Sequence, residues 1–210
     1  ARSEPGFVML LPINPEHPEP RKVRRAVDAL ERGEVIAYPT DTVYGIGCDL
    51  FNKKAIDHIY QIRHLPKTQK LTFICPDLSD IAHDAIVDNR QYRLLRRVLP
   101  GPYTFILEAT REVPKIVQSK RKTVGIRVPN HPVVQALVSE LGRPIITSSA
   151  VMPGGEPFID PEEIDDAFQG LAMVLDGGAG GLEATTVVDL TSGEIEIVRE
   201  GVGSIEELYG

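Results

Sequence analysis

The sequence predicts an α/β protein built as one large domain. Short runs of β-branched and aromatic residues, such as 35–38, alternate with amphipathic segments such as 17–32, where apolar residues recur at helical spacing. The 210 residues can enclose one sizeable core but are few for two. The sequence contains no internal repeat and no linker long enough to divide it. These observations favour a single core in which strands and helices alternate.

The composition is that of an ordinary globular protein, with 42% hydrophobic and 25% charged residues. Neither disorder nor a coiled coil is indicated. No apolar run approaches the roughly 20 residues that a membrane-spanning helix needs. The apolar stretch after Phe7 is too brief for a signal peptide and is stopped by Pro12. We therefore expect a cytoplasmic protein without a membrane partner.

Charge and cysteine content narrow the function classes. The net charge of −7 and pI near 5.3 argue against a wholly basic RNA coat protein, although a local basic groove stays possible. Cys48 and Cys75 have neither CxxC spacing nor a histidine at a metal-ligand interval. Both are predicted to be buried apolar residues, so neither a metal site nor a disulfide is expected.

The elements of the first half follow from apolar spacing and from helix caps. Val23, Ala26, Val27 and Leu30 define one helix face, and Gly33 ends that helix. In the last helix of this half, Tyr92, Leu95 and Leu99 are expected to point inward. The predicted order is a helix at 17–32, a strand at 35–38, a helix at 52–63, a strand at 71–75, a short helix capped by Asp77 or Ser79, and a helix capped by Asp88 or Asn89 that runs to Leu99.

The second half continues the alternation. Pro100, Gly101 and Pro102 end the preceding helix, and Ser192-Gly193 predicts the turn of a late hairpin. The predicted elements are a strand at 103–109, a short helical piece at 114–118, a strand at 123–128, a helix opened by His131 and closed by Gly142, a strand at 144–148, an acidic helix at 161–169, a strand at 172–175, hairpin strands at 185–191 and 194–198, and a short last helix.

Residues 33–49, GEVIAYPTDTVYGIGCD, look like the floor of a pocket. A buried strand leads there into a hydroxyl-rich turn, and the closely spaced glycines Gly45 and Gly47 follow. Glycine lets a ligand approach the main chain, so a small molecule is expected at this segment. An ordinary strand-to-helix loop is the alternative interpretation.

The sequence lacks the motifs of several common catalytic mechanisms. The sequence has no GxSxG elbow, no HExxH and no local Cys-His pair, and its glycine-rich residues 177–181 lack the lysine of a P-loop. Arg127 interrupts an apolar strand, so it must point outward, pair or bind something. Hydroxyls and single cations at strand ends remain, and such groups suit reactions in which the protein positions anionic reactants and neutralises phosphate charge.

Six segments together resemble the YrdC/YciO family. They are PTDTVYGIGCD at 39–49, LPGPYTFIL at 99–107, TVGIRVPNHPV at 123–133, PIITSSA at 144–150, TTVVDLT at 185–191 and IVREGVG at 197–203. The resemblance implies one domain at 10–207, preceded by an N-terminal extension at 1–9. It also implies a twisted open sheet of mixed strand direction with helices outside and a large concave, partly basic cavity.

The resemblance implies that L-threonine, bicarbonate and ATP with Mg²⁺ are the substrates, without a tightly bound metal. The products would be pyrophosphate and threonylcarbamoyl-AMP, the precursor of threonylcarbamoyladenosine in tRNA. The family pattern implies catalytic roles for Arg63, Lys67 and Ser149, substrate binding by Thr40, Thr42, Tyr44, Thr104 and Arg127, and nucleotide binding by Ser148, Thr185, Thr186 and Arg199.

Two departures resemble the YciO-type branch of the family. Leu65 stands where synthases usually carry the arginine of Lys-x-Arg-Pro, and Val151 stands where they carry the asparagine of Ser-x-Asn. One alternative function is therefore action on threonylcarbamoylated tRNA. Another is a non-catalytic module that binds tRNA or double-stranded RNA through its basic residues, Lys120, Arg121 and Lys122 together with Arg127 and the face of Arg93, Arg96 and Arg97.

Overall fold

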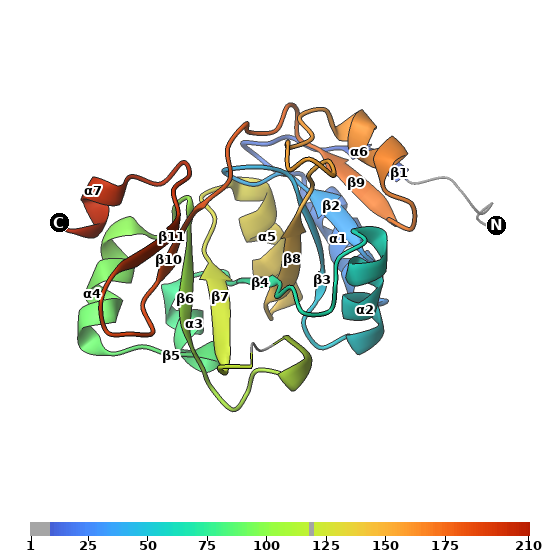
Figure 1. The fold of residues 1–210 in the computed structure, drawn as a ribbon. Helices are drawn as coiled ribbons and strands as arrows, with labels where there is room; N and C mark the ends of the chain where they lie inside the picture. The colour runs from blue at the N-terminus through green and yellow to red at the C-terminus, as the bar shows by residue number, and fades with distance from the viewer. Residues whose placement is uncertain (1–8, 118–119) are drawn as a thin grey trace.

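The computed structural model describes residues 9–117 and 120–210, and within these ranges eleven strands form one sheet (Figure 1). Residues 1–8, which include most of the expected extension, and residue 118 of the expected short helix lie outside them. The strands are β1 (Met9–Pro12), β2 (Ile36–Tyr38), β3 (Gly45–Asp49), β4 (Thr72–Ile74), β5 (Ala85–Ile86), β6 (Tyr103–Ala109), β7 (Thr123–Arg127), β8 (Ile145–Ser149), β9 (Met173–Asp176), β10 (Thr186–Asp189) and β11 (Glu196–Arg199).

The sheet has mixed strand direction. Its order is β1-β9-β2-β3-β8-β4-β7-β6-β10-β11, and β5 pairs with β6 beside this path. The pairs β1·β9, β2·β9, β4·β7 and β6·β10 are parallel, and the remaining pairs are antiparallel. The expected single-domain α/β fold with a mixed open sheet is confirmed.

Helices cover the sheet on both faces. They are α1 (Pro20–Glu31), α2 (Lys53–Ile62), α3 (Leu78–Asp84), α4 (Asn89–Val98), α5 (Pro132–Leu141), α6 (Pro161–Ala167) and α7 (Ile205–Leu208), with a 3₁₀ turn at Lys115–Val117. Ile74 and Ile145 pack with α1 and α5, whereas their strand neighbours Phe73 and Ile146 pack with α2 and α6 on the opposite face. Figure 1 places α4 and α7 beside β10 and β11 at one end of the molecule.

Helix ends largely follow the predicted caps. Asp88 forms a capping box with Gln91, and Gly142 closes α5 in the left-handed region at φ 76°. In α4 the buried face is Leu94, Leu95 and Val98, whereas Tyr92 is 43% exposed. Leu95 and Leu99 are buried as expected, but the inward direction expected for Tyr92 is wrong, because the buried face of α4 runs through Leu94 and Val98 and leaves Tyr92 at its edge.

The closely spaced glycines serve packing inside the sheet. Gly45 and Gly47 belong to β3, which pairs antiparallel with β2, and residues 39–44 form the connection. A Cβ atom on Gly45 would lie 2.7 Å from Cε2 of Tyr38, and one on Gly47 would overlap the Tyr38 hydroxyl. Both glycines therefore make room for the buried Tyr38 ring, and of the two only Gly45 also borders the cavity described below.

Replacing Gly47 by alanine tests this packing. The added methyl group would also lie 2.7 Å from Cγ2 of Ile145, so we expect Gly47→Ala to lower the free energy of unfolding by about 1–3 kcal/mol. Gly154→Ala is the control, because nothing lies within 4 Å of its built Cβ. Urea denaturation measures both variants, and a Gly47→Ala midpoint equal to that of the control would contradict the packing role of Gly47.

Candidate active site

A cavity of about 580 Å³ lies on the sheet face that α1 and α5 cover elsewhere. A row of register-paired residues from four neighbouring strands forms its floor: Thr147 of β8, Thr72 of β4, Gly125 of β7 and Ile106 of β6. Because side chains alternate along a strand, these positions share one face with Ile145. The cavity therefore opens where the α1–α5 layer ends.

The described lining of this cavity carries cations and no carboxylate. Arg63, Lys70, Arg127 and Arg199 border it, together with hydroxyl residues and glycines, but none of the described lining residues is Asp or Glu. The whole chain has 30 acidic and 23 basic residues. Positive charge is thus concentrated here within an acidic protein, and it favours an anionic ligand.

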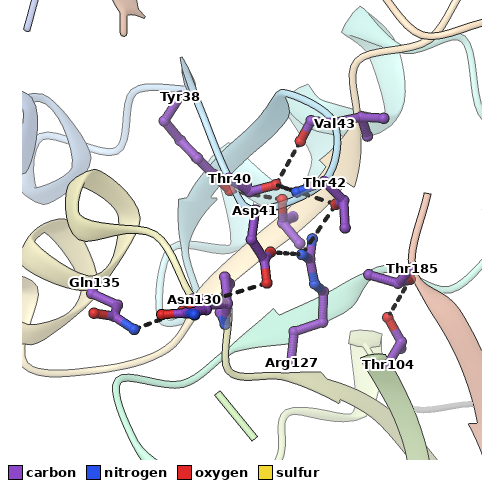
Figure 2. A network of polar contacts seen from close by, with 12 residues as sticks. Tyr38, Thr40, Asp41, Thr42, Val43, Thr104, Arg127, Asn130, Gln135 and Thr185 are labelled. Carbon is purple, nitrogen blue, oxygen red and sulfur yellow. Dashed lines mark hydrogen bonds and ion pairs between the residues drawn. The ribbon is translucent and has the colours of Figure 1, made fainter. Parts of the chain in front are cut away.

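A buried ion pair fixes one wall of the cavity (Figure 2). Nη2 of Arg127 donates to Oδ1 of Asp41 at 2.8 Å and to Oγ1 of Thr42 at 3.2 Å. The backbone N–H of Asn130 donates to Oδ2 of Asp41 at 2.9 Å. Burial lowers the pKa of Arg127, and the Asp41 carboxylate opposes that change. An arginine so paired stays charged, and the pair joins the 39–44 connection to the end of β7.

Asp41 is a site residue that the sequence did not indicate. It lies between two threonines in a turn, where a carboxylate is usually solvated, and only the fold brings it to Arg127. Within the described chain, Nε of Arg127 is a buried donor without a partner. A buried donor left unpaired is costly, so a ligand oxygen that accepts from it would relieve that cost.

A glycine-rich loop, residues 177–181, packs on the same connection. The Tyr44 hydroxyl donates to the carbonyl of Gly178 at 2.7 Å and accepts from the N–H of Gly177 at 3.1 Å. The N–H of Gly181 donates to the carbonyl of Thr42 at 2.8 Å, and a Cβ on Gly181 would overlap that oxygen. Tyr44 borders the cavity, but its hydroxyl positions the loop, and burial raises its pKa.

Two further arginines are held by neutral acceptors. Nε of Arg63 donates to Oγ of Ser148 at 3.1 Å, Nη1 lies 3.4 Å from the carbonyl oxygen of Val151, and the guanidinium lies over the Phe168 ring. Arg199 donates to the carbonyl and the hydroxyl of Thr185 at 2.9–3.1 Å. Burial lowers the pKa of both arginines. Their charges stay available to an anion.

The strands supply the remaining polar lining. Oγ1 of Thr104 lies 2.9 Å from Oγ1 of Thr185, and the Tyr38 hydroxyl donates to Oγ1 of Thr147 at 2.7 Å. Sequence reasoning missed the lining residues Thr72, Thr123 and Thr147, as well as Lys70. The sequence pattern could have indicated these lining residues, because hydroxyl residues or glycine occupy alternate positions of the strands, as in Thr123-Val124-Gly125.

Three residues expected at the ligand lie outside this lining. Oγ1 of Thr40 donates to the carbonyl of Val43 at 2.7 Å and serves the turn. Oγ1 of Thr186 donates to the carbonyl of Gly203 at 2.7 Å, because side chains alternate at the start of β10, where Thr185, just before the strand, and Val187 border the cavity and Thr186 faces the core. Lys67 is 62% exposed and pairs with Asp57 at 2.6 Å. The other candidates, including Ser149, border the cavity.

Basic residues follow one another at the start of β7, beside the cavity. Lys120, Arg121 and Lys122 are exposed, and the next residue, Thr123, borders the cavity. RNA binding by these residues stays a prediction.

The two departures from the synthase pattern have different surroundings. Val151 borders the cavity, while Leu65 packs against the core.

The described residues offer neither a metal-binding cluster nor a membrane-spanning helix. No group of three or more His, Cys, Asp or Glu residues there could hold a metal ion. No helix in that part of the chain is long and apolar enough to cross a membrane. Cys48 and Cys75 are buried as expected, and burial raises the pKa of both thiols.

Removing one partner tests the buried ion pair. We expect Arg127→Met to lower the free energy of unfolding by about 3–5 kcal/mol, because the largely buried Asp41 loses its counter-charge. The double variant D41N/R127M should recover part of that loss. Arg32→Met is the control, since Arg32 is a surface residue that pairs with Glu34, and an exposed pair of this kind contributes about 1 kcal/mol or less. Equal urea midpoints for the Arg127 and Arg32 variants would contradict a structural role for the buried pair.

Sequence comparisons place this chain among known proteins. The Sua5/YciO/YrdC family model, described as "Telomere recombination", matches residues 28–201. The protein YciO of Escherichia coli strain K12, described as uncharacterized, is 43% identical over 197 residues, covering 92% of this chain and 96% of that protein. A threonylcarbamoyl-AMP synthase of Serratia proteamaculans is 30% identical over 179 residues, covering 83% and 94%.

Solved structures agree with the sequence matches. The crystal structure of E. coli YciO has a TM-score of 0.92 at 40% identity and covers 96% of this chain and 100% of its own. P. abyssi Sua5, solved with L-threonine, has a TM-score of 0.89 at 27% identity, covering 96% of this chain and 60% of its own. Matches in both sequence and fold span most of the chain, which therefore belongs to the Sua5/YciO/YrdC family.

Proposed function

We propose that this protein forms threonylcarbamoyl-AMP from L-threonine, bicarbonate and MgATP, with release of pyrophosphate. The observation that carries the proposal is a cavity of about 580 Å³ that has four cations and no carboxylate in its described lining. ATP, the carbamate of threonine and pyrophosphate are all anions. The relatives named as threonylcarbamoyl-AMP synthases and the L-threonine bound to P. abyssi Sua5 support this choice of substrates.

The proposed reaction requires no nucleophile from the protein. The threonine amine and bicarbonate combine to a carbamate with loss of water. A carbamate oxygen then attacks the α-phosphorus of ATP, the bond from that phosphorus to the bridging oxygen breaks, and pyrophosphate leaves. The substrate thus supplies its own nucleophile, and the protein contributes orientation and charge neutralisation. A lining of hydroxyls and cations without a described carboxylate, cysteine or histidine suits this division of labour.

The contacts within the cavity suggest a role for each group. Arg63 and Arg199 are held by neutral acceptors, so we assign them to the phosphates, with Mg²⁺ entering as part of the nucleotide. Arg127 and Thr42 are assigned to threonine or its carbamate, since Nε of Arg127 lacks a partner within the described chain. Ser149 lies beside Ser148, which fixes Arg63, and is assigned to the reacting centre.

Pyrophosphate release tests the proposal. Protein incubated with ATP, Mg²⁺, bicarbonate and L-threonine should release pyrophosphate in a threonine-dependent way. Arg199→Ala should lower kcat/KM about 10- to 100-fold, because a charge that stabilises the transition state is lost. Lys67→Met should stay within about two-fold, since Lys67 pairs with Asp57 outside the lining. Absence of threonine-dependent release at high enzyme concentration would overturn the synthase assignment.

A second candidate is action on threonylcarbamoylated tRNA, for example removal of the group. It is favoured by Leu65 and Val151, which lack the cation and the amide found in the synthase pattern. RNA phosphates would then meet Lys70 and the exposed Lys120 beside the cavity. It ranks second because the described lining has no carboxylate or histidine to activate water.

Placing the asparagine of the Ser-x-Asn pattern at position 151 tests which of the two candidate functions is correct. Val151 borders the cavity, so Val151→Asn adds a hydrogen-bonding group there with little change of volume. We expect Val151→Asn to raise threonine-dependent pyrophosphate release about ten-fold, equivalent to about 1.4 kcal/mol of transition-state stabilisation, and an unchanged rate would count against the synthase assignment. Val198→Asn, at an exposed position, is the control. Modified tRNA left unchanged after incubation with the wild-type protein would count against the second candidate.

A further inference from the structure

A second cavity, of about 280 Å³, lies between α4, α7 and the β10–β11 turn. Its floor is apolar, formed by the buried residues Leu94, Leu190 and Leu208. These residues share a core cluster with Val188, whereas the preceding residue, Val187, borders the large cavity. The second cavity therefore belongs to the opposite face of the sheet, at the end that carries α4 and α7 in Figure 1.

Helix α4 borders this cavity with an arginine-rich surface. Arg90, Arg93, Arg96 and Arg97 are all exposed, and Arg90 and Arg97 border the cavity itself. Within the described residues, none of the four forms an ion pair. Arg97 instead donates to the carbonyl of Leu208 at 2.8 Å. Two helical turns separate Arg90 from Arg97, so their Cα atoms lie roughly 10 Å apart along the axis.

Helix stability does not account for all of this charge. Arg96 and Arg97 lie in the last turn, where cations interact favourably with the helix dipole. Arg90 lies in the first turn, where a cation interacts unfavourably with the helix dipole, and in that turn only the N-cap carboxylate of Asp88 offsets this cost. Like charges spaced three or four residues apart add about 0.2–0.5 kcal/mol of repulsion per pair. An anionic partner would offset these costs, in a chain whose net charge is −7.

We propose that the cleft between α4 and α7 binds an acidic segment of another protein. One large apolar side chain of that segment enters the leucine-lined floor, and carboxylates on either side of it pair with Arg90 and Arg97. Tyr209 borders the same cavity and is 65% exposed, so its aromatic side chain, which has an apolar face and a polar hydroxyl, lies at the rim. Tyrosine and arginine are enriched among the side chains that carry the binding energy of protein interfaces.

The charges of the rim favour a protein segment over RNA. Asp88 and Glu194 border the same cavity as Arg90 and Arg97. A strand with regularly spaced phosphates would meet these carboxylates as well as the cations. A peptide can place a basic side chain opposite them, and its apolar side chain suits an aliphatic floor better than a nucleobase does.

Selection from a random peptide library tests the proposal. The full-length protein is immobilised, and enriched peptides are synthesised with a fluorescent label for anisotropy measurements. We expect enriched peptides to carry acidic residues around one large apolar residue and to bind more weakly as salt rises. Arg90→Glu should weaken binding by about ten-fold or more, equivalent to about 1.4 kcal/mol. Peptides with the paired acid changed to lysine should regain affinity for that variant.

Controls keep this interface distinct from the large cavity. Lys120→Glu, in the other basic cluster, should bind the peptides as the wild type does, and urea denaturation verifies that each variant is folded. Release of pyrophosphate should not change in Arg90→Glu, so the outcome here is independent of the proposed synthase activity. Enrichment without acidic residues, or equal peptide affinity of Arg90→Glu and wild type, would overturn the proposal. Loss of tRNA binding in Arg90→Glu with no peptide bound would assign the surface to RNA and also overturn it.

Discussion

The pairing of Arg127 with Asp41 holds together the parts of the large cavity that are distant in sequence. Arg127 ends β7 in the middle of the sheet, and Asp41 belongs to the connection between β2 and β3. The same carboxylate binds the N–H of Asn130 just before α5. Since the glycine-rich loop at 177–181 packs on that connection through Tyr44, it too depends on the pair. A charged group buried in this way stabilises only the arrangement that supplies its counter-charge.

The cavity also shows how an acidic protein keeps a cationic site. Arg63 and Arg199 are held by a hydroxyl and by backbone carbonyls, which fix their direction without cancelling their charge. Partial burial raises the free energy of each charged guanidinium, and for this reason it lowers the pKa of both arginines. A bound anion would offset that cost. Such preorganised charge acts on a phosphate with little further rearrangement. Distant surface acids contribute little at this range, because salt screens them.

Local pattern predicts the regular elements well. The apolar spacing of α1 and the glycine after α5 place both helices to within a few residues, and β6 has the predicted bounds. The sequence did not indicate β1, β3 or β5. The glycines of β3 weaken its strand pattern, and β1 and β5 are short and acquire their definition from distant partners, β9 and β6. Non-local pairing of this kind leaves little trace in local propensity.

The cavity is harder to predict than the fold. Strand ends rich in hydroxyls identify Thr42, Thr104 and Ser149, but side-chain direction decides whether a hydroxyl faces a ligand or the main chain. Thr185 and Thr186 have the same chemistry and opposite environments. Asp41 was missed because its partner, Arg127, is 86 residues away in sequence. The direction of a side chain and its contacts with residues distant in sequence are fixed only when the sheet is assembled, so local sequence does not reveal them.

The bare backbone at Gly125 leaves a place where one side chain would change what this cavity admits. Gly125 lies at the centre of the floor, and a Cβ there would meet only Thr104 and Thr72 at 3.5–3.6 Å, which is ordinary van der Waals contact. An alanine would therefore fit without moving a strand, and each larger side chain would take volume from the ligand. The capacity of the cavity can therefore be reduced at one position without changing the charges around it.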